Sequence, residues 1–67
     1  MTTLGDAFPQ EQARCREVLG HYKEIGPAGV FGALMIEDVL RRADVAAIEG
    51  DVVAMIRIYQ EMREIKS

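Results

Sequence analysis

The 67-residue chain has little of what small proteins commonly use for chemistry or covalent reinforcement. It contains no tryptophan, one cysteine (Cys15) and one histidine (His21). A single cysteine cannot form an intramolecular disulfide, which excludes a cysteine-stapled secreted scaffold. A zinc site built from cysteine and histidine would lack ligands. Because so small a domain is marginal when it stands alone, association with a second copy or a larger protein is the support that remains.

The chain also lacks a cluster of basic residues and a long apolar run. Eight basic residues are spread among 11 acidic ones, which gives a net charge of −3 and argues against a nucleic-acid footprint. The longest apolar stretch, 27–36, is about half of the roughly 20 residues that a membrane-spanning helix needs. No basic segment precedes an apolar one at the N-terminus, so no secretory signal is predicted. We therefore expect a cytoplasmic protein without a membrane partner.

Apolar residues recur at helical spacing, and no alternating run or hairpin dipeptide predicts a strand. The pattern predicts one all-α domain over 1–67, with three helices at about 7–25, 28–49 and 51–65. The second and third helices are expected to form an antiparallel hairpin, and residues 1–5 a frayed lead.

Local signals place the helix ends. Asp6 is suited to cap the first helix, and Gly26 followed by Pro27 is suited to end it. Gly50 is expected to end the second helix, and Asp51 to cap the third.

The stretch GPAGVFGALMIEDV, residues 26–39, places three glycines three residues apart. A phosphate-binding loop would need a preceding strand and a lysine, serine or threonine behind the glycines, and both are missing. Glycines in a helix cost up to about 1 kcal/mol each relative to alanine. Gly29 and Gly32 therefore indicate that another helix passes close: the first, the third, or the same helix of a second subunit.

The C-terminal stretch GDVVAMIRIYQEMRE resembles the second helix of a tetratricopeptide or pentatricopeptide unit. Met55, Tyr59 and Met62 stand at the positions where those families place a small or apolar, an aromatic and a small or apolar residue, although Met55 replaces the usual alanine. One unit cannot form a solenoid, so the resemblance implies a helical hairpin and not that family's function. The whole chain also resembles small uncharacterised helical proteins of bacteriophage and prophage genomes, on YKEIGPAGVFGALMIEDVLRRAD followed by GDVVAMIRIYQEM. That resemblance implies no activity.

No residue pattern indicates catalysis. His21 lies six residues beyond Cys15, about 9 Å along a helix, too far to activate it, so we interpret Cys15 as a buried structural thiol. The acidic residues Asp44, Glu49 and Asp51 lack the alternating pattern of a calcium loop. We expect no enzyme, no cofactor, no metal site and no small-molecule ligand.

The third helix has two apolar faces. One carries Val52, Met55, Ile56, Tyr59 and Met62, and the other carries Ala54, Ile58 and Ile65. The second face is either a wider core contact or an exposed seam. As interface candidates we name the apolar start of the second helix and this second face: Phe31, Leu34, Met35, Ala54, Ile58 and Ile65.

Two functions follow from these patterns. The first is a small protein-interaction module that forms a homodimer or binds a larger protein. The alternative is a nucleic-acid-binding helical domain of a phage or bacterial regulator. Its basic face would come from either of two groups: Arg14, Arg16 and Lys23, or Arg41 and Arg42.

Overall fold

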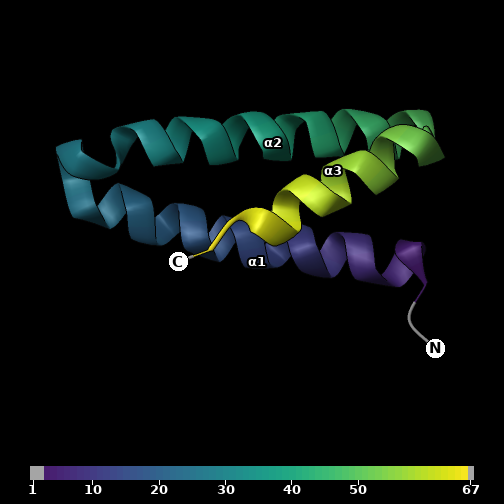
Figure 1. The fold of residues 1–67 in the computed structure, drawn as a ribbon, viewed down its shortest axis with the longest axis horizontal. Helices are drawn as coiled ribbons and strands as arrows, with labels where there is room; N and C mark the ends of the chain where they lie inside the picture. Colours follow the sequence, from purple (N-terminus) through teal and green to yellow (C-terminus); the bar gives the residue numbers. More distant parts are fainter. Residues whose placement is uncertain (1–2, 67) are drawn as a thin grey trace.

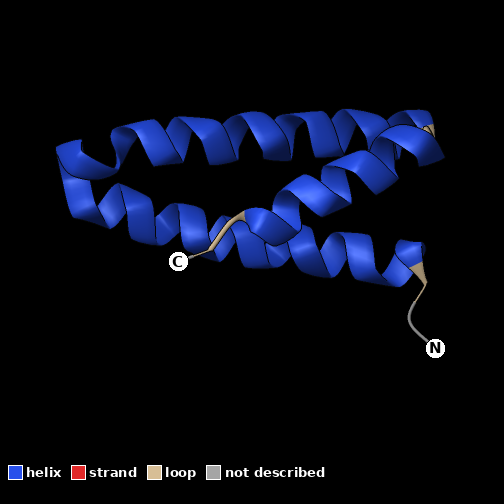
Figure 2. Ribbon diagram, viewed as in Figure 1, coloured by secondary structure: helices blue, strands red, loops and turns tan. Residues whose placement is uncertain are grey.

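A computed structural model describes residues 3–66, and the described chain is helical almost throughout (Figures 1 and 2). The elements are α1 (Leu4–Ile25), the 3₁₀ turn η1 (Gly26–Gly29), α2 (Val30–Glu49) and α3 (Val52–Glu64). The all-α prediction is confirmed. Helical structure continues through η1, so the chain forms one long helix over 4–49, bent at η1, followed by a shorter one, rather than three separate helices.

The first helix begins three residues earlier than the predicted start at 7. Thr3, not Asp6, is the N-cap: its hydroxyl accepts a hydrogen bond from the Asp6 backbone N–H at 3.2 Å. Its hydroxyl also donates to the Asp6 carboxylate at 3.1 Å. Leu4 and Gly5, which we expected in a frayed lead, therefore lie in the first turn of α1, and Leu4 packs against the core. Residues 1 and 2 of that expected lead are outside the described residues.

The bend between α1 and α2 depends on glycine. Gly26 has φ 82°, a value that residues with a Cβ rarely adopt, and its N–H donates to the Lys23 carbonyl. Pro27 occupies the first turn of η1, where its missing N–H costs nothing. The chain reverses here within four residues, without a loop.

Gly29 and Gly32 lie against Tyr22 of α1, which identifies the helix that passes close to them. A Cβ at Gly29 would overlap the Tyr22 carbonyl group, and one at Gly32 would stand 2.7 Å from the Tyr22 ring. Tyr22 thus fills the space that two side chains would otherwise occupy.

The second turn is a Schellman motif. Gly50 has φ 68°, and the N–H groups of Gly50 and Asp51 donate to the carbonyls of Ala47 and Ala46, at 3.2 and 3.0 Å. Asp51 then caps α3 by accepting from the Ala54 N–H at 3.1 Å, as predicted.

The short helix α3 crosses diagonally over the α1–α2 pair and closes the core (Figure 1). The core is built from apolar residues of α1, α2 and α3: Phe8, Cys15, Val18, Ile36, Val39, Leu40, Ala43, Ala46, Ile58 and Met62. Phe8, Cys15 and Met62 are its largest fully buried side chains.

Arg14 of α1 binds the C-terminal end of α3 through hydrogen bonds. Its guanidinium donates to the backbone carbonyls of Met62 at 2.6 Å and Ile65 at 2.8 Å, while Glu11 holds it at 3.0 Å. The Met62 carbonyl also accepts the Ile65 N–H at 3.1 Å, so Arg14 adds a second hydrogen bond there, and its positive charge opposes the negative end of the helix dipole. A hydrogen bond to the Glu11 carboxylate raises the pKa of Arg14 above its ordinary value.

We predict that Gly29→Ala destabilises the fold by about 1–3 kcal/mol, because the new Cβ meets backbone that cannot yield easily. The matched control is Gly20→Ala within α1, where nothing lies within 4 Å of the new Cβ. That change should stabilise the protein by up to about 1 kcal/mol. Urea or thermal unfolding of both variants measures the difference, and equal effects would contradict the close contact.

Candidate interaction surfaces

The side of α2 turned away from the core carries a row of residues that are all exposed except Asp38, which is half-buried. They are spaced alternately by three and four positions: Phe31, Leu34, Asp38, Arg41, Val45 and Ile48. We call these six residues the outer stripe. Its four apolar members expose 75% (Phe31), 60% (Leu34), 49% (Val45) and 85% (Ile48) of their surface. The buried residues of α2 lie about half a turn away on the opposite side of the helix, so α2 is apolar on two sides.

Three of the predicted interface residues lie where an interface could use them. Phe31, Leu34 and Met35 are exposed, and with Asp38 and Val39 they line a shallow depression beside α3. The sequence interpretation missed Val45 and Ile48, because the charged pair Asp38 and Arg41 interrupts the apolar row. The alternating spacing from Phe31 to Ile48 is the signal that would have included them.

The other three predicted interface residues point inward. Ile58 is 6% exposed and belongs to the core, while Ala54 and Ile65 are partly buried against it. Instead Val52, Val53 and Ile56 are exposed. This corrects the expectation of a seam at Ala54, Ile58 and Ile65. The side of α3 that faces the core combines these three residues with Met55, Tyr59 and Met62 of the other predicted face.

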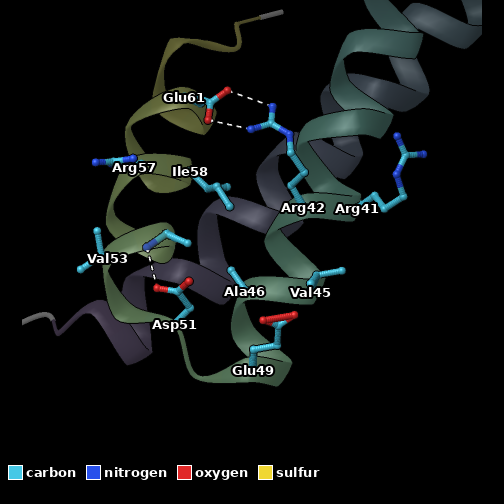
Figure 3. A pocket seen from close by; sticks show the side chains of 11 residues that line it. Arg41, Arg42, Val45, Ala46, Glu49, Asp51, Val53, Arg57, Ile58 and Glu61 are labelled. Carbon is cyan, nitrogen blue, oxygen red and sulfur yellow. Dashed lines mark hydrogen bonds and ion pairs between the residues drawn. The ribbon is translucent and has the colours of Figure 1, made fainter.

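An open groove of about 680 Å³ runs between α2 and α3 (Figure 3). The turn at Asp51 lies at one end of the groove, and the Arg42–Glu61 ion pair lies at the other. In this pair the Arg42 guanidinium donates two hydrogen bonds to the Glu61 carboxylate, at 3.0 and 2.9 Å. Ala46 and Ile58 lie between them. The Asp51 carboxylate and the Arg42 guanidinium are already engaged, so they do not converge on a ligand as in a small-molecule site.

The guanidinium of Arg42 lowers the pKa values of the two carboxylates that pair with it. Hydrogen bonds from Arg42 are the main cause that lowers the pKa of Glu61 and of Asp38, and Arg41 adds to the effect on Asp38 at 2.7 Å. Both carboxylates remain ionised well below neutral pH.

Cys15 is fully buried, as predicted. Its Sγ lies 3.7 Å from the Met62 carbonyl oxygen, and burial raises the pKa of the thiol. A thiol held protonated and away from solvent is a poor nucleophile.

Two of the three acidic residues considered as cation ligands, Asp44 and Asp51, have other roles. Asp44 accepts from Gln12 at 3.0 Å and pairs with Arg16 at 3.5 Å, and Asp51 caps α3. Among residues 3–66, no three His, Cys, Asp or Glu side chains are grouped so that they could hold a metal ion.

The basic residues named for nucleic-acid binding are all ion-paired. Arg14 pairs with Glu11, Arg16 with Asp44, and Lys23 with Glu37, at 3.0, 3.5 and 3.5 Å. Arg41 and Arg42 both pair with Asp38, at 2.7 and 3.0 Å. Neither group forms a basic face free of acidic neighbours.

Within the described part of the chain, no helix has both the length and the apolar content needed to cross a bilayer.

Nothing matches the chain among protein-family models, curated proteins or solved structures. The resemblances to phage proteins and to a tetratricopeptide-like unit stay predictions.

The inner face of α3 can be tested by truncation. Ile58→Ala should lower the free energy of unfolding by about 2–5 kcal/mol, because it opens a cavity in the core. Ile56→Ala, on the exposed face of the same helix, should change it by only about 0.5 kcal/mol. Chemical denaturation measures both, and the reverse order would place the core on the other face.

Removing the Arg42–Glu61 pair with Glu61→Gln should cost about 0.2–1 kcal/mol at neutral pH, since both side chains are exposed to solvent. The lowered pKa of Glu61 means that this stabilisation is complete above the unfolded-state value near 4.3. It is lost as the pH falls through the lowered folded-state pKa, so wild type and variant should converge in acid. Glu64→Gln, on the same helix, is the control. If the free energies of unfolding of wild type and Glu61→Gln still differed in acid, the ion pair would not be the source of the difference.

Proposed function

We propose that the protein is a small helical interaction module without catalytic activity, and that it self-associates as a homodimer through the outer stripe of α2. The observation that carries the proposal is the pair of apolar sides on α2. One side completes the core, and the other exposes Phe31, Leu34, Val45 and Ile48. A row of large exposed apolar residues on one helix is the type of surface that proteins bury against a partner.

The size of the chain supports the same proposal. A domain of 67 residues buries a smaller fraction of its surface than a larger one does, and it has no disulfide to compensate. Two copies that cover the same patch on each other would add buried apolar area in the simplest symmetric way.

The nucleic-acid alternative is less well supported. All five basic residues that would form its binding face are ion-paired with acidic residues of the same chain. Binding phosphates would require those pairs to break.

Sedimentation velocity over a range of micromolar concentrations tests the proposal. The wild-type chain should move from monomer to dimer as its concentration rises. Ile48→Glu, which alters a side chain that is 85% exposed, should keep the helical circular dichroism spectrum and shift the chain to monomer. Ile56→Glu, on the exposed face of α3, is the matched control and should still dimerise. A wild-type chain that stays monomeric throughout would overturn self-association.

A further inference from the structure

The outer stripe has the spacing of a coiled-coil seam. Its steps of three, four, three, four and three residues from Phe31 to Ile48 are those of heptad positions a and d. The stripe is apolar at both ends and charged in the middle, where Asp38 and Arg41 stand. A single helix in water gains nothing from this spacing, whereas two helices packed along their seams do.

The outer stripe is complementary to a copy of itself that runs in the opposite direction. Read from its two ends inward, it pairs Phe31 with Ile48, Leu34 with Val45, and Asp38 with Arg41. All three pairs are centred on the same point, between residues 39 and 40. Each joins an a position to a d position.

We propose that a second copy of the chain docks antiparallel along the outer stripe, with a two-fold axis between residues 39 and 40. Phe31 and Leu34 of each copy then pack on Ile48 and Val45 of the other, and the two Asp38–Arg41 pairs meet at the centre. This arrangement rests on the proposed self-association and adds the direction and register of the two helices.

Charge complementarity selects this arrangement over its rivals. A parallel pair would place Asp38 against Asp38 and Arg41 against Arg41, and a shift by one heptad would place a charge against an apolar residue. Juxtaposed like charges and unpaired buried charges are the devices that suppress wrong coiled-coil pairings. In the antiparallel register every charge in the stripe meets its opposite.

The neighbours of the stripe are compatible with a close approach. Asp38 already accepts hydrogen bonds from Arg41 at 2.7 Å and Arg42 at 3.0 Å, so a second Arg41 would extend an existing network. The flanking acids Glu37 and Asp44 are each paired with a basic residue of α1 at 3.5 Å. In Figure 1, α2 forms one long edge of the molecule, with α1 along the other edge and α3 crossing between them, so the outer side of α2 is unobstructed.

Charge reversal tests the register. Asp38→Arg and Arg41→Asp should each weaken dimerisation by roughly tenfold or more, because each places like charges together twice at the centre. The double variant D38R/R41D restores both pairs and should dimerise within a few-fold of wild type. An equimolar mixture of the two single variants should form a heterodimer, because each of the two arginines of one variant then faces an aspartate of the other. Sedimentation velocity measures association, and circular dichroism checks that each variant is folded.

Cysteine cross-linking provides a second measurement that does not depend on charge. Leu34→Cys and Val45→Cys should form a disulfide-linked dimer under mild oxidation only when the two variants are mixed. Within either variant alone, the two introduced cysteines would be eleven residues apart along the helices, or about 16 Å, which a disulfide cannot span. The wild-type chain is the control for Cys15, which is buried.

The outcomes separate the two proposals. A wild-type dimer that both charge reversals leave intact, or that cross-links within a single cysteine variant, overturns the antiparallel register and leaves self-association standing. Single charge variants that dissociate while the double variant and the mixture also fail to associate overturn the register as well. A monomeric wild type overturns both. Rescue by the double variant together with cross-linking confined to the mixture supports the register.

Discussion

The contact between Tyr22 and the glycines at the start of α2 is the constraint on which the rest of the fold depends. With no side chain at Gly29 and Gly32, α2 approaches α1 until the Tyr22 carbonyl and ring fill that space. The positive φ of Gly26 turns the chain just before this contact. Close approach over the first turns brings α1 and α2 side by side as an antiparallel pair, and the pair forms the surface on which α3 packs (Figure 1).

Once that pair has formed, the position of α3 follows from its polar ends as much as from its apolar side chains. Asp51 satisfies the first N–H groups of α3, and Arg14 of α1 binds carbonyls at its last turn. Met62, whose carbonyl receives Arg14, is fully buried between the helices. A helix of 13 residues is marginal in isolation, so tertiary contacts at both ends and along one face stabilise it.

The same geometry explains why α2 has an unpartnered side. Its inner side contacts both α1 and α3, so its outer side lies at the edge of the molecule. In the proposed dimer, the central charges of the outer stripe lower its apolar content but determine which surface can pair with it. A wholly apolar stripe would bind more strongly and less selectively. Asp38 and Arg41 therefore have two roles: an ion pair within the chain, and the register of the proposed interface.

The sequence by itself determined the features that depend on neighbouring residues: the helical content, the Gly26 turn, the Asp51 cap and the placement of Cys15 on an inward stripe. Tertiary structure decided the remainder. It showed that Tyr22 is the neighbour of Gly29 and Gly32, that Ile58 points inward while Ile56 does not, and that Val45 and Ile48 share the exposed row begun by Phe31. The physical reason is that periodicity gives the angle of each side chain about its own helix axis. Which angle faces the core depends on where the other helices lie, and that is decided by contacts between residues far apart in the chain.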